Sequence, residues 1–222
     1  MAAGHESNMG IAFTYNEPTI SFEYMLEVAR LAKNMGLKTV MISNGFIKEK
    51  ALREVLPLLS AIKVDLKSFR DKFYREQVRG ELEPVLKSLE IIKEVGVWLE
   101  IVVLLIPTLN DSAAEVRDLC AWVRAKLGPD VPVHFTRFHP TYRLTDLPPT
   151  PVSSLERAWK IGRDAGLNYV YLGNVPGHPG ENTTCPGCGE ILIRRVGYRI
   201  LSNRLVNGSC PDCNRSIPGV WS

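Results

Sequence analysis

The chain has 222 residues, of which 45% are hydrophobic and 23% are charged, and its formal net charge is +3. This length suits one large domain with a small appendage. The longest apolar run, residues 95–109, is interrupted by Glu100 and Pro107, which excludes a membrane span. The first ten residues lack a basic start followed by an apolar block, so we expect a soluble protein of the reducing cytoplasm.

The positive charge is concentrated in the tail of the chain. Residues 185–222 carry five arginines against only Glu190 and Asp212, and the rest of the chain is neutral overall. A neutral body with a faintly basic tail is a poor electrostatic basis for nucleic-acid binding as the main activity. A nucleic-acid role for the arginines at 194, 195, 199 and 204 is an alternative, but we expect them to be solvated charges and a nucleic-acid adaptor to be disfavoured.

Short apolar runs alternate with longer segments of helical period up to residue 172. This rhythm predicts an α/β fold in which βα units build a parallel sheet. Strands are predicted at 10–15, 37–43, 61–66, 97–105, 133–138 and 169–172. Helices are predicted between them, including 20–34, 48–59, 113–127 and 153–165. Cys120 lies among apolar residues at helical spacing, which indicates a core position rather than a ligand.

Two breaks divide the chain. The proline-rich segment 140–151 cannot sustain a helix or a central strand, so it is predicted to be a loop and a candidate lid. The second break precedes the cysteine-rich tail. We therefore predict an α/β domain over residues 1–172, a linker over 173–184 and a small domain over 185–222.

The small domain contains two C-P-x-C turns, from Cys185 to Cys188 and from Cys210 to Cys213, separated by 21 residues. Each turn points two thiolates at a common centre, and four thiolates in a closed tetrahedron form a structural zinc site. The alternating residues 191–205 predict a hairpin that is too small to fold without metal. Two disulfides or a rubredoxin-like iron site are alternatives, but a reducing compartment and the spacing favour a zinc ribbon.

Polar residues gather at the predicted strand ends, where chemistry concentrates in parallel α/β folds. Asn16 and Glu17 follow the first strand, and a carboxylate there either binds an ammonium group or only caps a turn. Ser43 and Asn44 close the second strand, and because a helical segment follows at 48–59, a βα turn that exposes backbone amides is predicted here rather than a hairpin. His139 ends the fifth strand, where a capping or packing role is the alternative.

The third strand alternates, so Lys63, Asp65 and Lys67 share one face while the apolar residues between them pack on helices. These charges would point toward the interior face of the sheet. Because buried charges are costly unless paired, Asp65 and Lys67 form either a structural ion pair or part of a site for a zwitterion. The segment 110–112 is predicted only to start a helix.

Taken in order, these motifs resemble the strand-end motifs of radical S-adenosylmethionine (radical SAM) enzymes close to pyruvate formate-lyase activases. The segments that carry the resemblance are F-T-Y-N-E-P at 13–18, I-S-N-G-F at 42–46, V-D-L-K at 64–67, I-P-T-L-N-D at 106–111 and F-H-P at 138–140. Further segments are similar to the radical SAM subgroup of the AmmeMemoRadiSam system. They are T-D-L-P-P-T-P at 145–151, G-N-V-P-G at 173–177 and the four-cysteine tail ending in I-P-G-V-W.

Members of this family bind a 4Fe-4S cluster and SAM, and they cleave SAM reductively to a 5′-deoxyadenosyl radical that abstracts a hydrogen atom. The resemblance implies that Glu17 holds the methionine ammonium of SAM. It also implies that Ser43 and Asn44 meet the ribose or the methionine carboxylate, and that His139 approaches the adenosine. The other residues of the implied SAM pocket are Asn16, Asp65 and Lys67.

The cluster of this family is held by a C-x-x-x-C-x-x-C loop after the first strand, and no such spacing occurs in this sequence. Residues 2–7 resemble the end of a crossover helix. The resemblance therefore implies a partial (βα) radical-SAM-type barrel that lacks its first βα unit and is followed by the zinc ribbon. The first predicted strand would then lie at a sheet edge, which natural proteins usually cover.

The leading interpretation is a fragment or split half of a radical SAM enzyme. It would carry most of the SAM pocket and the zinc ribbon, and a protein partner or a missing N-terminal segment would supply the cluster. The alternative is a non-catalytic module that binds SAM, another nucleotide-like ligand or a protein. A barrel aldolase also fits the βα rhythm, with Lys63 or Lys67 as its activated lysine. The sequence predicts neither a membrane nor a nucleic-acid partner.

Overall fold

The computed structural model describes residues 9–221 of the chain, so the helix end predicted at 2–7 lies outside the described residues. Its larger part is a parallel sheet in which each strand lies beside its neighbour in sequence, from β1 at one edge to β6 at the other. The strands are β1 (Gly10–Phe13), β2 (Lys38–Ser43), β3 (Ala61–Asp65), β4 (Trp98–Leu105), β5 (Val133–Arg137) and β6 (Val170–Gly173). The six predicted strands are confirmed to within two residues at each end, and closure into a partial barrel stays a prediction.

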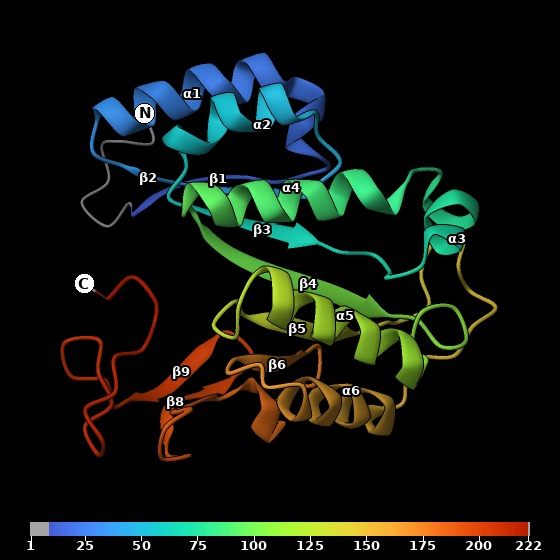
Figure 1. Cartoon of the computed structure of the whole chain (residues 1–222), viewed down its shortest axis with the longest axis vertical. Coiled ribbons are helices and arrows are strands. Elements are labelled where there is room, and N and C mark those ends of the chain that lie inside the picture. Colours follow the sequence, from blue (N-terminus) through green and yellow to red (C-terminus); the bar gives the residue numbers. More distant parts are fainter. Residues whose placement is uncertain (1–8, 222) are drawn as a thin grey trace.

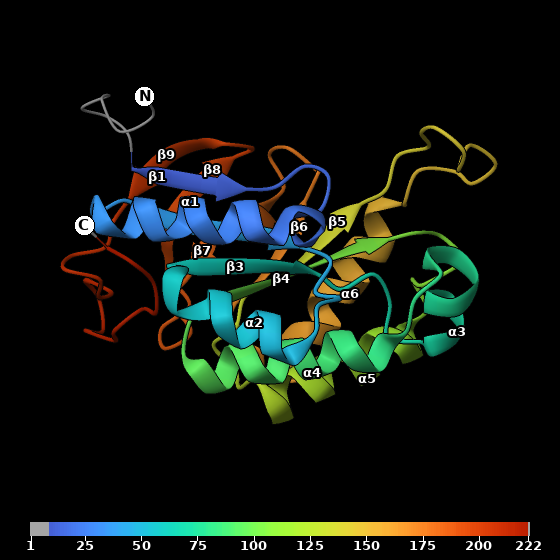
Figure 2. The ribbon, with the colours of Figure 1, turned by 90° about the horizontal axis from the view of Figure 1, so that it is seen from above.

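Helices cover one face of this sheet, as Figure 1 shows from the front and Figure 2 from above. The longer helices are α1 (Phe22–Asn34), α2 (Glu49–Val55), α4 (Leu82–Val95), α5 (Ala113–Lys126) and α6 (Val152–Asp164). The shorter ones are η2 (Pro18–Ser21), η3 (Leu56–Leu58), α3 (Asp71–Phe73), η4 (Tyr74–Val78) and η5 (Pro179–Glu181). Among residues 9–221, no helix is both long and apolar enough to cross a membrane.

Strand β4 shows how the sequence separates the two faces of the sheet. Leu99, Ile101, Val103 and Leu105 are buried in the core against the helices, whereas the residues between them are partly exposed. Successive side chains of a strand point to opposite faces, so these other residues belong to a second face, which we call the open face. Burial of each large apolar side chain stabilises the fold by about 1.5–3 kcal/mol.

A second sheet lies at the end of the large sheet where its strands begin (Figure 1). It contains β7 (Thr183–Thr184), β8 (Ile191–Val196) and β9 (Arg199–Asn203), and its antiparallel β8–β9 pair confirms the predicted hairpin. Tyr169, which precedes β6, shares a small core with Leu192, Ile193 and Ile217. The predicted linker 173–184 contains η5 and β7 and so takes part in this sheet. The domain limits stay a prediction.

The segment 140–151 is a loop, as predicted. Its regular pairing within the described residues is limited to a bridge between Thr141 and Leu144. Leu144 and Leu147 pack beside Phe138 in a small apolar cluster at the carboxyl end of the strands. The loop projects from that end in Figure 2, and a role as a lid stays a prediction.

Candidate functional site

Glu17 joins the ends of the first two strands at the carboxyl end of the large sheet. Its Oε1 accepts hydrogen bonds from Ser43 Oγ at 2.8 Å and from the hydroxyl and backbone nitrogen of Thr19 at 3.1 and 3.3 Å. Its Oε2 accepts one from the backbone nitrogen of Asn44 at 2.7 Å. The carboxylate therefore caps η2 and holds the turn after β2, and Oε2 keeps a lone pair for a further donor.

The turn after β2 is a βα turn, as predicted, and it depends on Gly45. This glycine has a φ of +75°, and a Cβ at its position would lie 2.8 Å from Val64 Cγ1 and 3.1 Å from Val85 Cγ1. Its backbone nitrogen donates to Ser43 Oγ at 3.0 Å, and Asn44 Oδ1 accepts from the next backbone nitrogen at 2.8 Å. The close packing of Gly45 thus aims the Asn44 N–H at Glu17.

Asp65 lies between two lysines at the end of β3. Its Oδ1 is 2.5 Å from Lys63 Nζ and its Oδ2 is 3.1 Å from Lys67 Nζ. All three side chains are partly exposed on the open face, in agreement with the predicted alternation. The structural ion pair that the sequence left open is therefore present, and a contact of this pair with SAM stays a prediction.

Two side chains that the sequence pattern did not reveal hold Lys67 in place. Buried Asn110 donates from Nδ2 to the carbonyls of Lys67 at 2.7 Å and Leu104 at 2.9 Å, and its Oδ1 accepts from Ile106 N at 2.6 Å. The Tyr74 hydroxyl accepts from the Lys67 backbone nitrogen at 3.1 Å, and burial raises the pKa of Tyr74 to about 12. The prediction for segment 110–112 was therefore incomplete, because Asn110 also ties the end of β4 to the residues after β3.

Asn16 and His139 are placed differently from the other predicted pocket residues. Both are exposed, and within residues 9–221 neither side chain makes a hydrogen bond or ion pair. The structure thus joins Glu17, Ser43 and Asn44 in one network. Asp65 forms a second polar group at the end of the adjacent strand. Assignment of all these residues to a cofactor stays a prediction.

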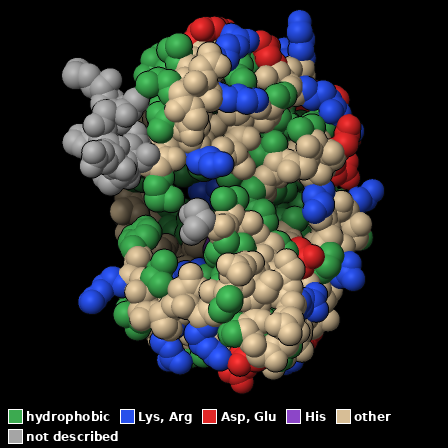
Figure 3. Space-filling view, turned by 90° about the vertical axis from the view of Figure 1, so that its left-hand side faces the viewer, with side chains coloured by type: hydrophobic (Ala, Val, Ile, Leu, Met, Phe, Trp, Pro, Cys, Tyr) green, Lys and Arg blue, Asp and Glu red, His purple; other side chains and the backbone are tan. Residues whose placement is uncertain are grey.

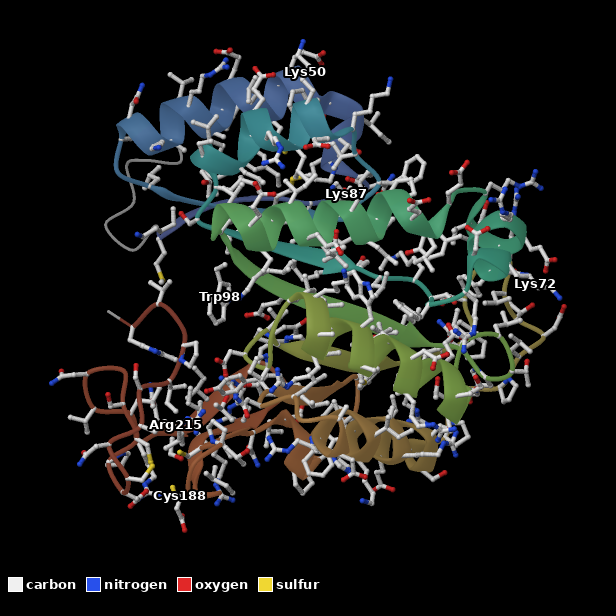
Figure 4. The ribbon with its side chains drawn as sticks, in the orientation of Figure 1. Lys50, Lys72, Lys87, Trp98, Cys188 and Arg215 are labelled. Carbon is white, nitrogen blue, oxygen red and sulfur yellow. The ribbon has the colours of Figure 1, made fainter. Side chains whose placement is uncertain are left out.

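The four cysteines of the tail converge as predicted. Their sulfurs lie within 4.8 Å of one another, with Sγ–Sγ distances of 3.5 Å between Cys185 and Cys213 and 3.6 Å between Cys188 and Cys210. Four thiolates bound tetrahedrally at ~2.3 Å would lie about 3.8 Å apart. All four are free thiols, and Figure 4 shows Cys188 at the lower left, near Arg215. The group fits a single metal ion.

The electrostatics of this cysteine group favour a bound cation. Burial opposes ionisation of Cys185, but hydrogen bonds from the backbone of Cys188 and Gly187 and from neighbouring thiols outweigh it and lower its pKa to about 7. A backbone hydrogen bond from Glu190 favours ionisation of Cys188, yet burial and the adjacent thiols raise its pKa to about 12. Neighbouring thiolates repel one another, and a bound cation at their centre would offset this repulsion and favour the ionised form that binds metal.

Gly187 leaves room for this centre. A Cβ at Gly187 would lie 3.3 Å from Cys213 Sγ and 3.6 Å from Cys185 Sγ. Cys120, by contrast, is completely buried in α5, and burial raises its pKa to about 12. Its predicted position in the core is confirmed.

The fold and these sites define an α/β protein with six sequential parallel strands, polar networks at the strand ends and a four-cysteine group able to hold a metal. Residues 7–120 match the family model of the radical SAM superfamily, and the chain belongs to this superfamily.

The chain is also similar to a curated protein over most of its own length, and its fold is similar to that of solved structures of low sequence identity. The uncharacterized protein MJ0808 of Methanocaldococcus jannaschii is 41% identical over 210 residues, which are 94% of this chain and 62% of that protein. A domain of a pyruvate-formate lyase-activating enzyme from Bacteroides vulgatus has a TM-score of 0.66 and 16% identity, covering 74% of this chain and 99% of that one. A radical SAM methyltransferase from Sphaerobacter thermophilus has a TM-score of 0.62 and 16% identity, covering 78% of this chain and 54% of that one. The chain therefore spans less than two thirds of its curated relative.

Proposed function

We propose that this chain forms the SAM-holding part of a radical SAM enzyme of the AmmeMemoRadiSam type, with its four cysteines around a structural zinc ion. The observation that carries the proposal is the network around Glu17, because it lies at the carboxyl end of the strands of a radical SAM superfamily member. In parallel α/β sheets, ligands bind outside the carboxyl ends of the strands. Membership of the superfamily implies SAM and an iron–sulfur cluster as cofactors.

Each part of the proposed SAM site has a chemical reason. The free lone pair of Glu17 Oε2 suits the methionine ammonium, since this carboxylate is already fixed by four hydrogen bonds. Ser43 and Asn44 would meet the methionine carboxylate or the ribose. The ion pair of Asp65 and Lys67 offers both charges to a zwitterion. Exposed Asn16 and His139 are free to meet the ligand, His139 on the adenosine side.

When bound and reduced, the cluster would supply the electron that cleaves SAM to a 5′-deoxyadenosyl radical. We propose that a preceding or separate segment carries this cluster, because the C-x-x-x-C-x-x-C spacing is absent from the sequence. The four-cysteine group of the tail is poorly suited to bind this cluster in place of the C-x-x-x-C-x-x-C loop. Thiolates of a four-iron cluster each bind a different iron and lie farther apart than these sulfurs, and this group belongs to the opposite end of the strands.

The surface beside β1 supports a missing βα unit. Ile20, Tyr24, Leu31 and Met35 are 60–82% exposed, although their spacing of four, seven and four residues puts them on one face of α1 and its flanking turns. β1 is the edge strand next to this helix. An additional strand beside β1 would bring its own helix against this apolar stripe. Such a βα unit would account for the edge position of β1 and for the exposed apolar side chains of α1.

Zinc is the proposed metal because a closed set of four thiolates at these distances suits its tetrahedral geometry. The free thiols also agree with a reducing cytoplasm, where we propose that the protein works. The metal would stabilise the second sheet, whose own core is small.

Equilibrium dialysis with labelled SAM tests the proposed SAM site. We expect one saturable site per chain, displaced by S-adenosylhomocysteine. Lys67→Met removes the cation paired with Asp65 and should weaken binding at least tenfold, about 1.4 kcal/mol. Lys72→Met is the matched control, because Figure 4 shows Lys72 projecting outward from α3. Absence of saturable binding at millimolar SAM, or equal loss in both variants, would overturn this assignment.

A further inference from the structure

A cavity of about 850 Å³ lies on the open face of the large sheet, at the end where the strands begin. It is therefore at the opposite end of the strands from Glu17 and Asp65. Its walls come from the first residues of β2–β4, from β5 and β6, and from the second sheet with the tail 217–221. Figure 3 shows the hollow at mid-height, between the part that carries β1 and β2 and the part that carries the second sheet. None of the residues proposed for SAM or metal lines it.

A fixed polar row crosses the floor of this cavity. Trp98 Nε1 donates to Glu100 Oε1 at 3.0 Å, and His134 Nε2 lies 2.8 Å from Glu100 Oε2. Glu100 and His134 remain 36% and 27% exposed, so the pair faces the cavity rather than the core. Each carboxylate oxygen of Glu100 therefore keeps a lone pair for a donor on a ligand.

The row continues onto the second sheet. The His134 ring stacks on Tyr171 with 4.9 Å between centroids, and the Tyr171 hydroxyl lies 3.0 Å from Thr183 Oγ1. Arg195 lies 6.0 Å from the centre of the Tyr171 ring and donates from Nη1 to Thr183 Oγ1 at 2.7 Å. Within residues 9–221 only Nη1 of Arg195 has acceptors, so its Nε and Nη2 hydrogens are available to an anion.

The electrostatics of the floor also favour a ligand with hydrogen-bond donors. Burial by itself raises the pKa of Glu100, but hydrogen bonds from His134 and Trp98 outweigh it, and its pKa is lowered. The carboxylate is therefore an ionised acceptor at neutral pH. Around it, the indoles of Trp98 and Trp221 line the walls, and Figure 4 shows Trp98 projecting from the start of β4 toward the second sheet.

These groups define the chemistry of an occupant. Aromatic walls favour a flat ring, which can stack on them in an offset or edge-to-face arrangement. Ionised Glu100 accepts from ring N–H groups, and Arg195 pairs with a phosphate or a carboxylate. The cavity also falls within the ~300–1,000 Å³ range of ordinary ligand sites.

We infer that this cavity is a second small-molecule site, distinct from the proposed SAM site, which binds a nitrogen-containing aromatic ring bearing an anionic group. Glu100 and His134 contact the polar edge of the ring, Trp98 stacks on its face, and Arg195 pairs with the anionic group. Two kinds of molecule carry this combination of groups: a nucleotide, whose anionic group is its phosphate, and a heteroaromatic carboxylate.

Calorimetric titration of the chain with guanosine 5′-monophosphate and, separately, with indole-3-acetate tests the inference. Binding of either probe identifies the source of the ligand. Arg195→Gln should weaken binding at least tenfold, whereas the neighbouring Arg194→Gln should not, because Arg194 is exposed and outside the cavity. Lys67→Met should leave this binding unchanged, which separates it from the SAM site.

Trp98→Leu provides a second variant that spares the contacts of the second sheet, and it should also weaken binding about tenfold. Thermal unfolding of each variant checks that it folds. The inference is overturned if neither probe binds at millimolar concentration, or if folded Arg195→Gln and Trp98→Leu proteins bind as tightly as the unchanged chain.

Discussion

Replacing Glu17 by glutamine tests the polar network at the carboxyl end of the strands. The amide oxygen of the new side chain can take the place of Oε1, which accepts three hydrogen bonds. Its NH₂ group would then face the backbone N–H of Asn44, which now donates to Oε2 at 2.7 Å. One hydrogen bond to a charged acceptor is lost, and two donors are brought together.

The expected size of this effect follows from the exposure of Glu17. A hydrogen bond to a charged group contributes about 1.5–3 kcal/mol. Glu17 is only partly buried, so water can compensate for part of the lost hydrogen bond. We therefore expect the free energy of unfolding to fall by about 1–2 kcal/mol. For a chain of this size the melting temperature should fall by about 2–8 °C. Affinity for SAM should fall at least tenfold, because the partner of the ammonium loses its charge.

Differential scanning calorimetry and SAM dialysis measure the two effects. Glu23→Gln is the matched control, since Glu23 is exposed on α1 and makes no ion pair within residues 9–221. Glu23→Gln should leave SAM affinity unchanged and should cost less stability than Glu17→Gln, because a carboxylate in the first turn of a helix contributes only about 0.3–1 kcal/mol. If Glu17→Gln melts within 1 °C of the unchanged chain and binds SAM as tightly, the assigned role of Glu17 is wrong.

Three further predictions concern the metal group, the turn after β2 and the acid response. If the proposed zinc site is correct, elemental mass spectrometry should find one zinc ion per chain, which Cys188→Ser should abolish and Cys120→Ala should retain, because Cys120 lies in the core; equal zinc contents in the two variants would contradict the site. Gly45→Ala should destabilise the chain by about 1–3 kcal/mol more than Gly36→Ala in urea unfolding, because both glycines have positive φ but only Gly45 has neighbours in the way. The pKa of Glu100 is lowered from its usual 4.5 in the folded state, so its stabilising contribution is present above that pH and lost as the pH falls through the folded value. Glu100→Gln should therefore flatten the acid limb of the stability curve, and an unchanged limb would refute the role of the His134–Glu100 contact.

The large sheet could be predicted from sequence because its strands carry two simple signals. Mostly apolar strands of four to eight residues recur between helical segments, and β3 and β4 alternate with a period of two. The same alternation placed Lys63, Asp65 and Lys67 on one face. The convergence of the cysteine turns could also be predicted, since a single hairpin is enough to bring two close pairs of thiols together.

Contacts between residues far apart in sequence could not be predicted, because they depend on the register of neighbouring strands. Asn110 looks like a helix-start residue in sequence, and its bond to the Lys67 carbonyl depends on how β4 lies beside β3. Glu100 and His134 are isolated mid-strand residues, 34 positions apart, that meet because β5 pairs with β4 and opposes His134 to Val102. Local pattern contains no such information.

Production of 5′-deoxyadenosine tests whether this chain takes part in radical SAM chemistry. This chain would be co-produced with a separate segment that carries a C-x-x-x-C-x-x-C loop, and the pair would be reconstituted with iron and sulfide under a strong reductant. We expect SAM to be cleaved to 5′-deoxyadenosine only when both parts are present, and we expect Glu17→Gln to reduce the yield sharply. A cluster-loaded pair that binds SAM yet forms no 5′-deoxyadenosine would contradict it and identify the chain as a ligand-binding module.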